Sequence, residues 1–230
     1  IPTFGKKSKK LLQYSHGLLA ANLDPTITVG GILKAIHGNI RIGHTKYFVT
    51  EACEYCNSFL DFFPKVGIIL NIEEDHLDFF KDINDIRASF QKFASTIPAD
   101  GFLAINGATP DLDAFKAPLH CQVETFGLDD SCNWHAKNIT FDNRACASFD
   151  VYYNGTFMLN LKLHVTGTHN ILNALSVCSV YHYLGLDLNI LNEGLKEFTG
   201  ADQRFEIKGK FNNITVVDDY AHHPTEIAAT

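Results

Sequence analysis

The sequence predicts an α/β fold with a mostly parallel sheet flanked by helices, together with a small antiparallel β subsheet. The segments 66–72 and 101–106 are almost continuously apolar, which is typical of parallel strands that are buried on both faces. Segments with helical periodicity alternate with such runs, as in folds that connect parallel strands through helices. Three alternating segments joined by turns, within 134–165, predict the antiparallel part.

Apolar spacing of three to four residues predicts four helices, at 6–22, 83–96, 167–184 and 188–198. The first of these should end at Asn22–Pro25, because a proline disfavours helical geometry in the residue before it. We expect the remaining strands at 26–29, 47–50, 122–127, 136–141, 147–153, 157–163 and 214–217. The pair Asn154-Gly155 predicts a tight hairpin turn between the last two antiparallel strands.

The composition limits the possible classes of protein. The chain has 230 residues, of which 46% are hydrophobic and 20% charged, enough for one large domain or one domain and a piece of another. A net charge of −7 argues against a nucleic-acid partner. No apolar run reaches membrane-spanning length and the first residues do not resemble a signal peptide, so we expect no membrane partner.

The six cysteines are irregularly spaced in a chain too large to need disulfide bonds. We therefore expect reduced thiols in a cytoplasmic protein. Cys53 and Cys56 have the spacing of a zinc or redox pair, but no matched second pair accompanies them, which disfavours zinc.

Two acidic runs follow predicted strands, at 51–54 and 73–76. Carboxylates and an imidazole at neighbouring strand ends could hold Mg²⁺, which prefers oxygen ligands. The alternative is a capping role, because acidic side chains stabilise the first turn of a helix.

Two further clusters open predicted helices. Gly5, Lys7 and Ser8 partly match a phosphate loop, in which helix amides, a lysine and a hydroxyl converge on an anion; a basic terminus is the alternative. Asn170 and Asn173 offer the donor and acceptor pair that matches the edge of adenine. The alternative is a helix cap followed by a surface polar residue.

The run 217–226 follows the last predicted strand and contains Asp219 and His222. Open α/β folds place ligand chemistry at such strand ends, whereas a solvated turn with a helix cap is the simpler alternative. Arg204, taken alone, would be a surface charge.

Taken together, these runs resemble the Mur ligases, and within them the alanine-adding member. The resemblance rests on residues 22–26, 29–31, 51–54, 58–59, 71–76, 169–174, 204–205 and 218–226. It implies a central, P-loop-like ATP-binding domain at 1–207. It also implies that 208–230 is the first strand and turn of a truncated C-terminal domain.

The resemblance further implies an ATP-dependent ligase of bacterial peptidoglycan synthesis, located in the cytoplasm, with ATP and Mg²⁺ as cofactors. Its substrates would be UDP-N-acetylmuramate and L-alanine, joined through an acyl phosphate. Because most of the amino-acid-binding domain would be missing, we expect this chain to be inactive by itself. Two alternatives stay open: a non-catalytic nucleotide-binding or scaffold domain, and the related ligase that recycles murein peptides.

Residue roles also follow from the resemblance. Lys7, His76 and His222 would be catalytic, with His222 facing the acyl phosphate. Ser8, Glu54 and His76 would hold magnesium. ATP would be bound by Lys6, Lys7, Ser8, Asn170, Asn173, Arg204 and Asp219.

The phosphate loop departs from the family pattern Gly-Thr-His-Gly-Lys-Thr. Counting back from Asn22 aligns Lys7 with its lysine and Ser8 with its last threonine. Lys6 then stands where the family has a glycine, so a side chain occupies a position at which backbone approaches phosphate.

Overall fold

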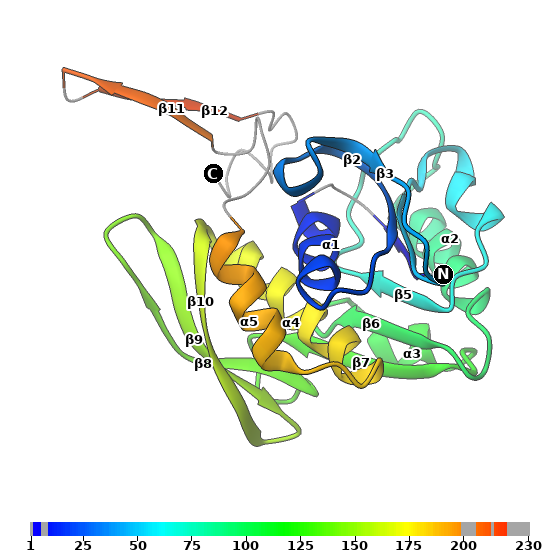
Figure 1. Ribbon diagram of the computed structural model, residues 1–230. Coiled ribbons are helices and arrows are strands. Elements are labelled where there is room, and N and C mark those ends of the chain that lie inside the picture. Colours follow the sequence, from blue (N-terminus) through cyan, green and yellow to red (C-terminus); the bar gives the residue numbers. More distant parts are fainter. Residues whose placement is uncertain (1, 6–8, 199–205, 213, 220–230) are drawn as a thin grey trace.

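Figure 1 shows a computed structural model of the chain, which describes residues 2–5, 9–198, 206–212 and 214–219. The described strands form a ten-stranded sheet and a separate two-stranded sheet. In the large sheet the order is β10-β9-β8-β7-β6-β5-β1-β4-β2-β3. In this order, neighbouring strands from β8 to β2 pair in parallel. Antiparallel pairs extend the sheet at both ends, through β9 on one side and β3 on the other.

The strands of the large sheet are β1 (Pro2–Gly5), β2 (Thr26–Leu33), β3 (Gly38–Arg41), β4 (Phe48–Ala52), β5 (Val66–Ile69), β6 (Phe102–Asn106), β7 (Gln122–Gly127), β8 (Trp134–Phe141), β9 (Cys146–Tyr153) and β10 (Thr156–Thr166). The helices are α1 (Lys9–Ala20), α2 (Ile83–Ser95), α3 (Leu112–Lys116), α4 (Thr168–Tyr183) and α5 (Leu188–Glu197), with short 3-10 helices η1 (Lys34–Ile36) and η2 (Tyr55–Asp61).

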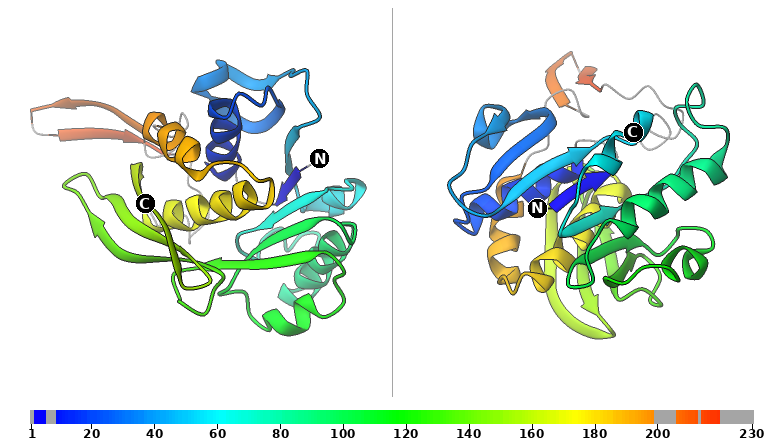
Figure 2. Two further views of the ribbon diagram at one scale, coloured as in Figure 1. Left: turned by 60° about the horizontal axis from the view of Figure 1, so that its bottom comes forward. Right: turned by 90° about the vertical axis from the view of Figure 1, so that its right-hand side faces the viewer.

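Two hydrophobic cores lie on opposite faces of the sheet. Along β6, Phe102 and Ala104 belong to the core that contains α1, α4 and α5, whereas Leu103 and Ile105 belong to the core that contains α2. Both faces of the strand are therefore buried, which explains why its sequence is apolar without alternation. Figure 2 shows α4 lying along the face of β8–β10, which continue the large sheet through the β7–β8 pair.

The predicted fold class is confirmed, and the differences concern short elements. Sequence patterns missed β1, β3 and α3, and the strand predicted at 26–29 continues to Leu33. The strand predicted at 66–72 ends at Ile69. The hairpin turn is confirmed, since Asn154 and Gly155 have φ of 48° and 78°, the left-handed geometry that this turn requires.

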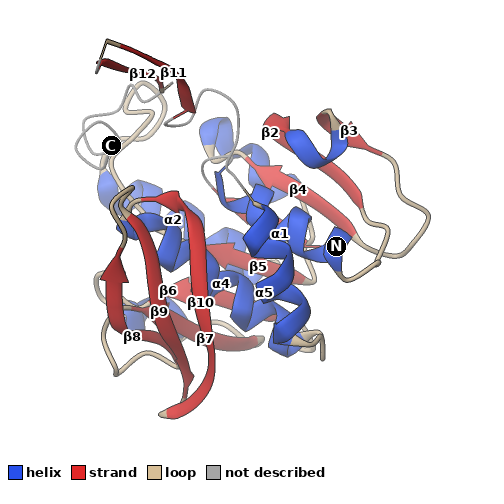
Figure 3. Cartoon of the chain, turned by 60° about the vertical axis from the view of Figure 1, so that its left-hand side comes forward, coloured by secondary structure: helices blue, strands red, loops and turns tan. Residues whose placement is uncertain are grey.

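The two-stranded sheet pairs β11 (Glu206–Phe211) with β12 (Ile214–Asp218), and it projects from the body of the molecule (Figure 3). Phe211 and Ile214 pair across this hairpin and are 72% and 63% exposed. An isolated hairpin is marginal in water, so these strands need further packing partners. Among the described residues, every helix is too short or too polar to cross a membrane.

Candidate functional site

The carboxyl end of β1 lies between the ends of β4 and β5. Gly5 pairs with Ala52 of β4, and Phe4 pairs with Ile68 of β5. Only residues 6–8 separate β1 from α1, so a helix follows the strand within three residues, the context that a phosphate loop requires. Lys6, Lys7 and Ser8 themselves lie outside the described residues.

Glu54, Asp75 and His76 form a group that could hold a metal ion. Each offers one ligand atom, and these atoms lie within 4.8 Å of one another. Glu54 follows β4, and Asp75 and His76 follow β5. These strands are not neighbours in the sheet, because β1 lies between them, so the group bridges two strands on either side of β1 and not the adjacent strand ends that we expected. The Nε2 atom of His76 is 3.6 Å from Oε1 of Glu54, whose side chain is 3% exposed.

A left-handed turn fixes His76. Its φ is 53°, its N–H donates to Oδ1 of Asp75 at 2.8 Å, and its carbonyl accepts from the N–H groups of Phe79 and Phe80, both at 2.9 Å. The ring centroid of Tyr55 is 4.8 Å from that of His76. Such backbone geometry in a non-glycine residue is costly and is often kept at functional sites.

Tyr55 is held in turn by a neighbouring carboxylate. Its hydroxyl donates to Oδ2 of Asp78 at 2.9 Å. This hydrogen bond, together with the negative charge of Asp78, raises the pKa of Tyr55, so the ring stays neutral where it packs on His76. The imidazole orientation is therefore set by contacts on its ring as well as on its backbone.

The donor set fits a divalent cation. Two carboxylates suit Mg²⁺ or Mn²⁺, and an imidazole is a better ligand for Mn²⁺ than for Mg²⁺. A carboxylate as buried as that of Glu54 requires positive charge nearby. Cys53 and Cys56 are exposed and do not belong to this group.

Glu51, at the start of the same acidic run, has a different role. Its Oε2 atom accepts from the N–H of Gly30 at 2.9 Å. A Cβ atom at Gly30 would lie 2.7 Å from this oxygen, so a larger residue would displace the carboxylate of Glu51 from this contact.

Asn170 and Asn173 lie together on α4 and are buried, with 5% and 2% of their surface exposed. Oδ1 of Asn170 accepts from Nε2 of Gln13 at 3.2 Å and from Nδ2 of Asn173 at 3.1 Å. Its Nδ2 donates to the carbonyl of Thr166 at 2.7 Å. The alternative of a cap and a surface polar residue is wrong, because Gly167 is the cap residue and both amides are inside.

The remaining predicted site residues are less informative. Asp219 follows β12, whose strand pairing is with β11 and not with the large sheet. Arg204 and His222 lie outside the described residues.

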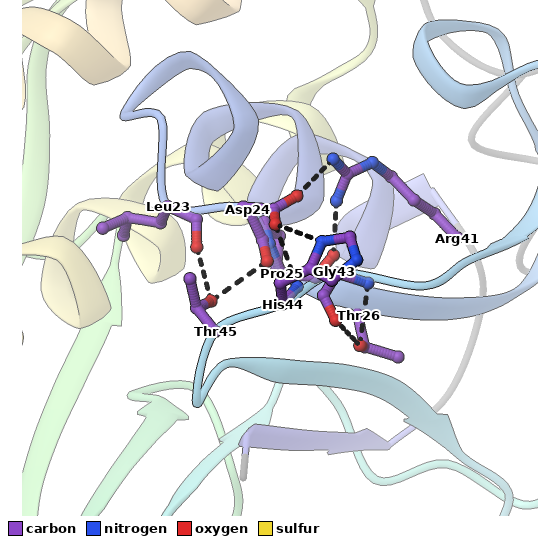
Figure 4. Close-up of polar contacts among 8 residues, drawn as sticks. All are labelled: Leu23, Asp24, Pro25, Thr26, Arg41, Gly43, His44 and Thr45. Carbon is purple, nitrogen blue, oxygen red and sulfur yellow. Dashed lines mark hydrogen bonds and ion pairs between the residues drawn. The ribbon is translucent and has the colours of Figure 1, made fainter.

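Another polar cluster, here called the Asp24 latch, lies at the turn that follows α1 (Figure 4). It consists of Asp24, Arg41, His44 and Thr45. Oδ1 of Asp24 accepts from Nη2 of Arg41 at 2.5 Å, and Oδ2 accepts from the backbone N–H of His44 at 2.9 Å. Hydrogen bonds from Arg41 and His44 lower the pKa of Asp24 to about 2. Thr45 donates to the carbonyl of Leu23 at 2.6 Å, so the latch joins the turn after α1 to the loop after β3.

Sequence reasoning missed three residues of these clusters. Asp75 was quoted within the acidic run but not singled out, and Gln13 and Tyr55 were not considered. A signal existed for Asp75, which precedes His76 directly. None existed for Gln13, whose partner is 157 positions away.

Comparisons with known proteins agree with this geometry. Residues 28–181 match the family model described as Mur ligase middle domain. The UDP-N-acetylmuramate–L-alanine ligase of Agathobacter rectalis is 53% identical over 216 residues, which cover 94% of this chain and 47% of that protein. The chain thus spans about half the length of the curated relatives it matches.

Solved structures show the same fold. The UDP-N-acetylmuramate-alanine ligase of Thermotoga maritima superposes with a TM-score of 0.85 at 31% identity, covering 100% of this chain and 52% of that one. The MurF ligase of Thermotoga maritima, solved in complex with ADP, has a TM-score of 0.78 at 17% identity, covering 99% of this chain and 55% of that one. At that identity the second likeness concerns the fold alone.

Proposed function

The chain belongs to the Mur ligase family, and from this premise we propose that it is the central, ATP-binding part of a ligase that joins L-alanine to UDP-N-acetylmuramate. The observation that carries the proposal is the group Glu54, Asp75 and His76 beside the end of β1. Phosphoryl transfer asks a protein mainly for positioning and for neutralisation of charge, and both are available at this edge of the sheet.

In the proposed mechanism, bound ATP supplies the phosphoryl group and a divalent cation neutralises the phosphate oxygens. Glu54, Asp75 and His76 would hold the cation, and Ser8 would add a hydroxyl ligand. Lys7 would offset the charge of the β- and γ-phosphates, with Lys6 beside it. Held by these side chains, the γ-phosphate would lie in line with the substrate carboxylate, and this alignment is the main requirement of the reaction.

The proposed reaction proceeds in two steps. The lactyl carboxylate takes the γ-phosphoryl group of ATP, which leaves ADP and an acyl phosphate. The amine of L-alanine attacks the acyl carbon, forms the amide bond, loses a proton and expels inorganic phosphate. His222 is the residue that we propose for the acyl-phosphate side, and Arg204 for the phosphates.

The nucleotide would be held at its other end on the side of the Asn170 and Asn173 amides, toward adenine, with Asn170 acting through Asn173, and by Asp219, toward the ribose. We propose 1–207 as the central domain and 208–230 as the start of the next one; the separate β11–β12 sheet begins at Glu206, so it favours a division two residues before that boundary. We also propose a bacterial, cytoplasmic location, in keeping with the bacterial sources of the relatives.

The test is phosphate release by the protein in its natural length, with ATP, UDP-N-acetylmuramate, L-alanine and Mg²⁺ or Mn²⁺. We expect release only when all are present, and loss of release in Glu54→Gln. Glu74→Gln is the matched control, because Glu74 is exposed and lies outside the metal-ligand group. Equal rates in the two variants would contradict the proposal.

The same assay separates the alternatives. A non-catalytic scaffold, suggested by Lys6 in place of glycine, would bind no ATP and release no phosphate. A recycling ligase would accept the tripeptide in place of L-alanine. The 53% identity to an L-alanine ligase favours the single amino acid.

A further inference from the structure

A buried glutamine connects α1 to α4. Gln13 is 0% exposed, and its Nε2 donates to Oδ1 of Asn170 at 3.2 Å. Because α1 begins at Lys9, directly after residues 6–8, this bond joins the helix that follows the proposed phosphate loop to the helix that carries both asparagines.

The amide of Asn170 is saturated inside the protein. A side-chain amide has two acceptor positions and two donor hydrogens. Gln13 and Asn173 fill the acceptor positions at 3.2 and 3.1 Å. Nδ2 donates to the carbonyl of Thr166 at 2.7 Å and lies 3.1 Å from Nε2 of His169, which accepts when the ring proton is on Nδ1. Asn170 therefore has no position left for a base.

Asn173 is used differently. It follows Asn170 by one helical turn, and one N–H of its Nδ2 reaches Asn170 at 3.1 Å. In the described part of the chain, its Oδ1 and its second N–H make no hydrogen bond. A donor and an acceptor on one amide are the pattern that matches the edge of adenine.

We propose that Gln13 is a positioning residue for base recognition, which rests on the proposed function of this site. Gln13 fixes the amide of Asn170, and Asn170 then orients the amide of Asn173. Asn170 is thus a brace and Asn173 is the amide that reads the base. The hydrogen bond from Gln13 also fixes the position of α4, which carries Asn173, relative to α1, which follows the proposed phosphate loop.

The test measures ATP and GTP affinity by equilibrium titration of the protein in its natural length. Gln13→Met removes the donor and keeps the side-chain length. We expect ATP affinity to fall about fivefold, as for a lost hydrogen bond, while GTP affinity and the kcat at saturating ATP stay unchanged. The preference for ATP over GTP therefore falls by the same factor.

The matched control is Ser15→Ala. Ser15 is 0% exposed on the same helix, and its hydroxyl has no hydrogen-bond partner among the described residues. It should leave the ATP preference unchanged, whatever its melting temperature. If Gln13→Met does not fold, Gln13→Leu removes the same donor without adding an ionisable group, and should show the same loss of preference.

Two negative results have different meanings. An unchanged ATP preference in the folded Gln13 variants overturns the positioning role and leaves the proposed function intact. A parent protein that binds neither nucleotide overturns the proposed function together with this inference, whereas one that binds both equally overturns the inference alone. A fall in melting temperature with an unchanged preference would show a structural role only.

Discussion

The Glu54 group and the Asn170 group are both polar clusters, yet they are built in opposite ways. In the first only Glu54 is buried, its three residues come from irregular segments after strands, and His76 is held in a left-handed turn. Asn170 and Asn173 are buried on one regular helix, and Oδ1 of Asn170 accepts from both Gln13 and Asn173.

The two clusters differ in the hydrogen-bonding character of their side chains. Carboxylates only accept hydrogen bonds, whereas the imidazole of His76 can also donate one, so this group offers the kinds of ligand atom that a divalent cation binds. The amides carry donors and acceptors together, so they close into a network that stabilises the helix contact. We therefore expect the first cluster to contribute mainly to activity and the second mainly to stability.

Glu54→Gln should give the largest effect. The variant removes the most buried ligand of the cation, and we expect phosphate release to fall on the order of 10³-fold, or about 4 kcal/mol in activation free energy. The melting temperature should change little by comparison, because glutamine keeps the shape of the glutamate side chain. Differential scanning calorimetry alongside the activity assay checks both statements. A variant that loses stability and keeps activity would reverse the comparison.

Asn170→Ala should have the opposite signature. It leaves donors of Gln13 and Asn173 and the carbonyl of Thr166 without their partner, at a total cost of about 3 kcal/mol in the free energy of unfolding. Urea denaturation measures this cost. Asn189→Ala is the matched control, because Asn189 is an exposed helical asparagine, and it should change stability by less than about 0.5 kcal/mol.

The sequence predicted the first cluster better than the second, for a physical reason. Carboxyl ends of neighbouring parallel strands share one edge, so two acidic runs after two strands can be expected to meet. Which acid meets the imidazole is decided by the turn at His76, and the sequence gives no sign of that φ of 53°. Asp75, and not Glu73 or Glu74, is consequently in the group.

The fold shows the same limit. β6 was predictable because an apolar run of its length has few other solutions. β1 is a central strand but has only four residues, including proline and glycine, and its place depends on pairing with β4 and β5. β3 carries no apolar alternation, and its residues are half-buried or exposed. Such elements are determined by tertiary contacts and not by local pattern.

His76→Asn should give a smaller loss than Glu54→Gln. Asparagine tolerates the left-handed backbone, so the turn is kept while the imidazole is removed. We expect Mn²⁺ affinity to fall about tenfold, with a smaller change for Mg²⁺, because imidazole favours Mn²⁺. Titration with each metal measures the two affinities. An unchanged affinity for both metals would place the imidazole outside the coordination sphere.

The smallest effect should come from the Asp24 latch, which lies outside both clusters. Its pKa of about 2 in the folded protein is below the ordinary value of 3.8, so folding favours the ionised form. The stabilisation is then fully present above pH 4 and is lost as the pH falls through the folded pKa of about 2. Asp24→Asn keeps a residue that accepts φ of 42° and removes the charge.

We expect Asp24→Asn to lower the melting temperature slightly at pH 7 and to leave it unchanged at pH 2. An exposed ion pair contributes little, so the activity should not change. Melting curves of the parent and the variant between pH 2 and pH 7 test this dependence. A difference that persists at pH 2 would mean that the backbone contacts of the loop, and not the charge on Asp24, hold the latch. In that case protonation of Asp24 would leave the contacts of the latch intact. The latch would then differ from the two clusters in chemistry as well as in position.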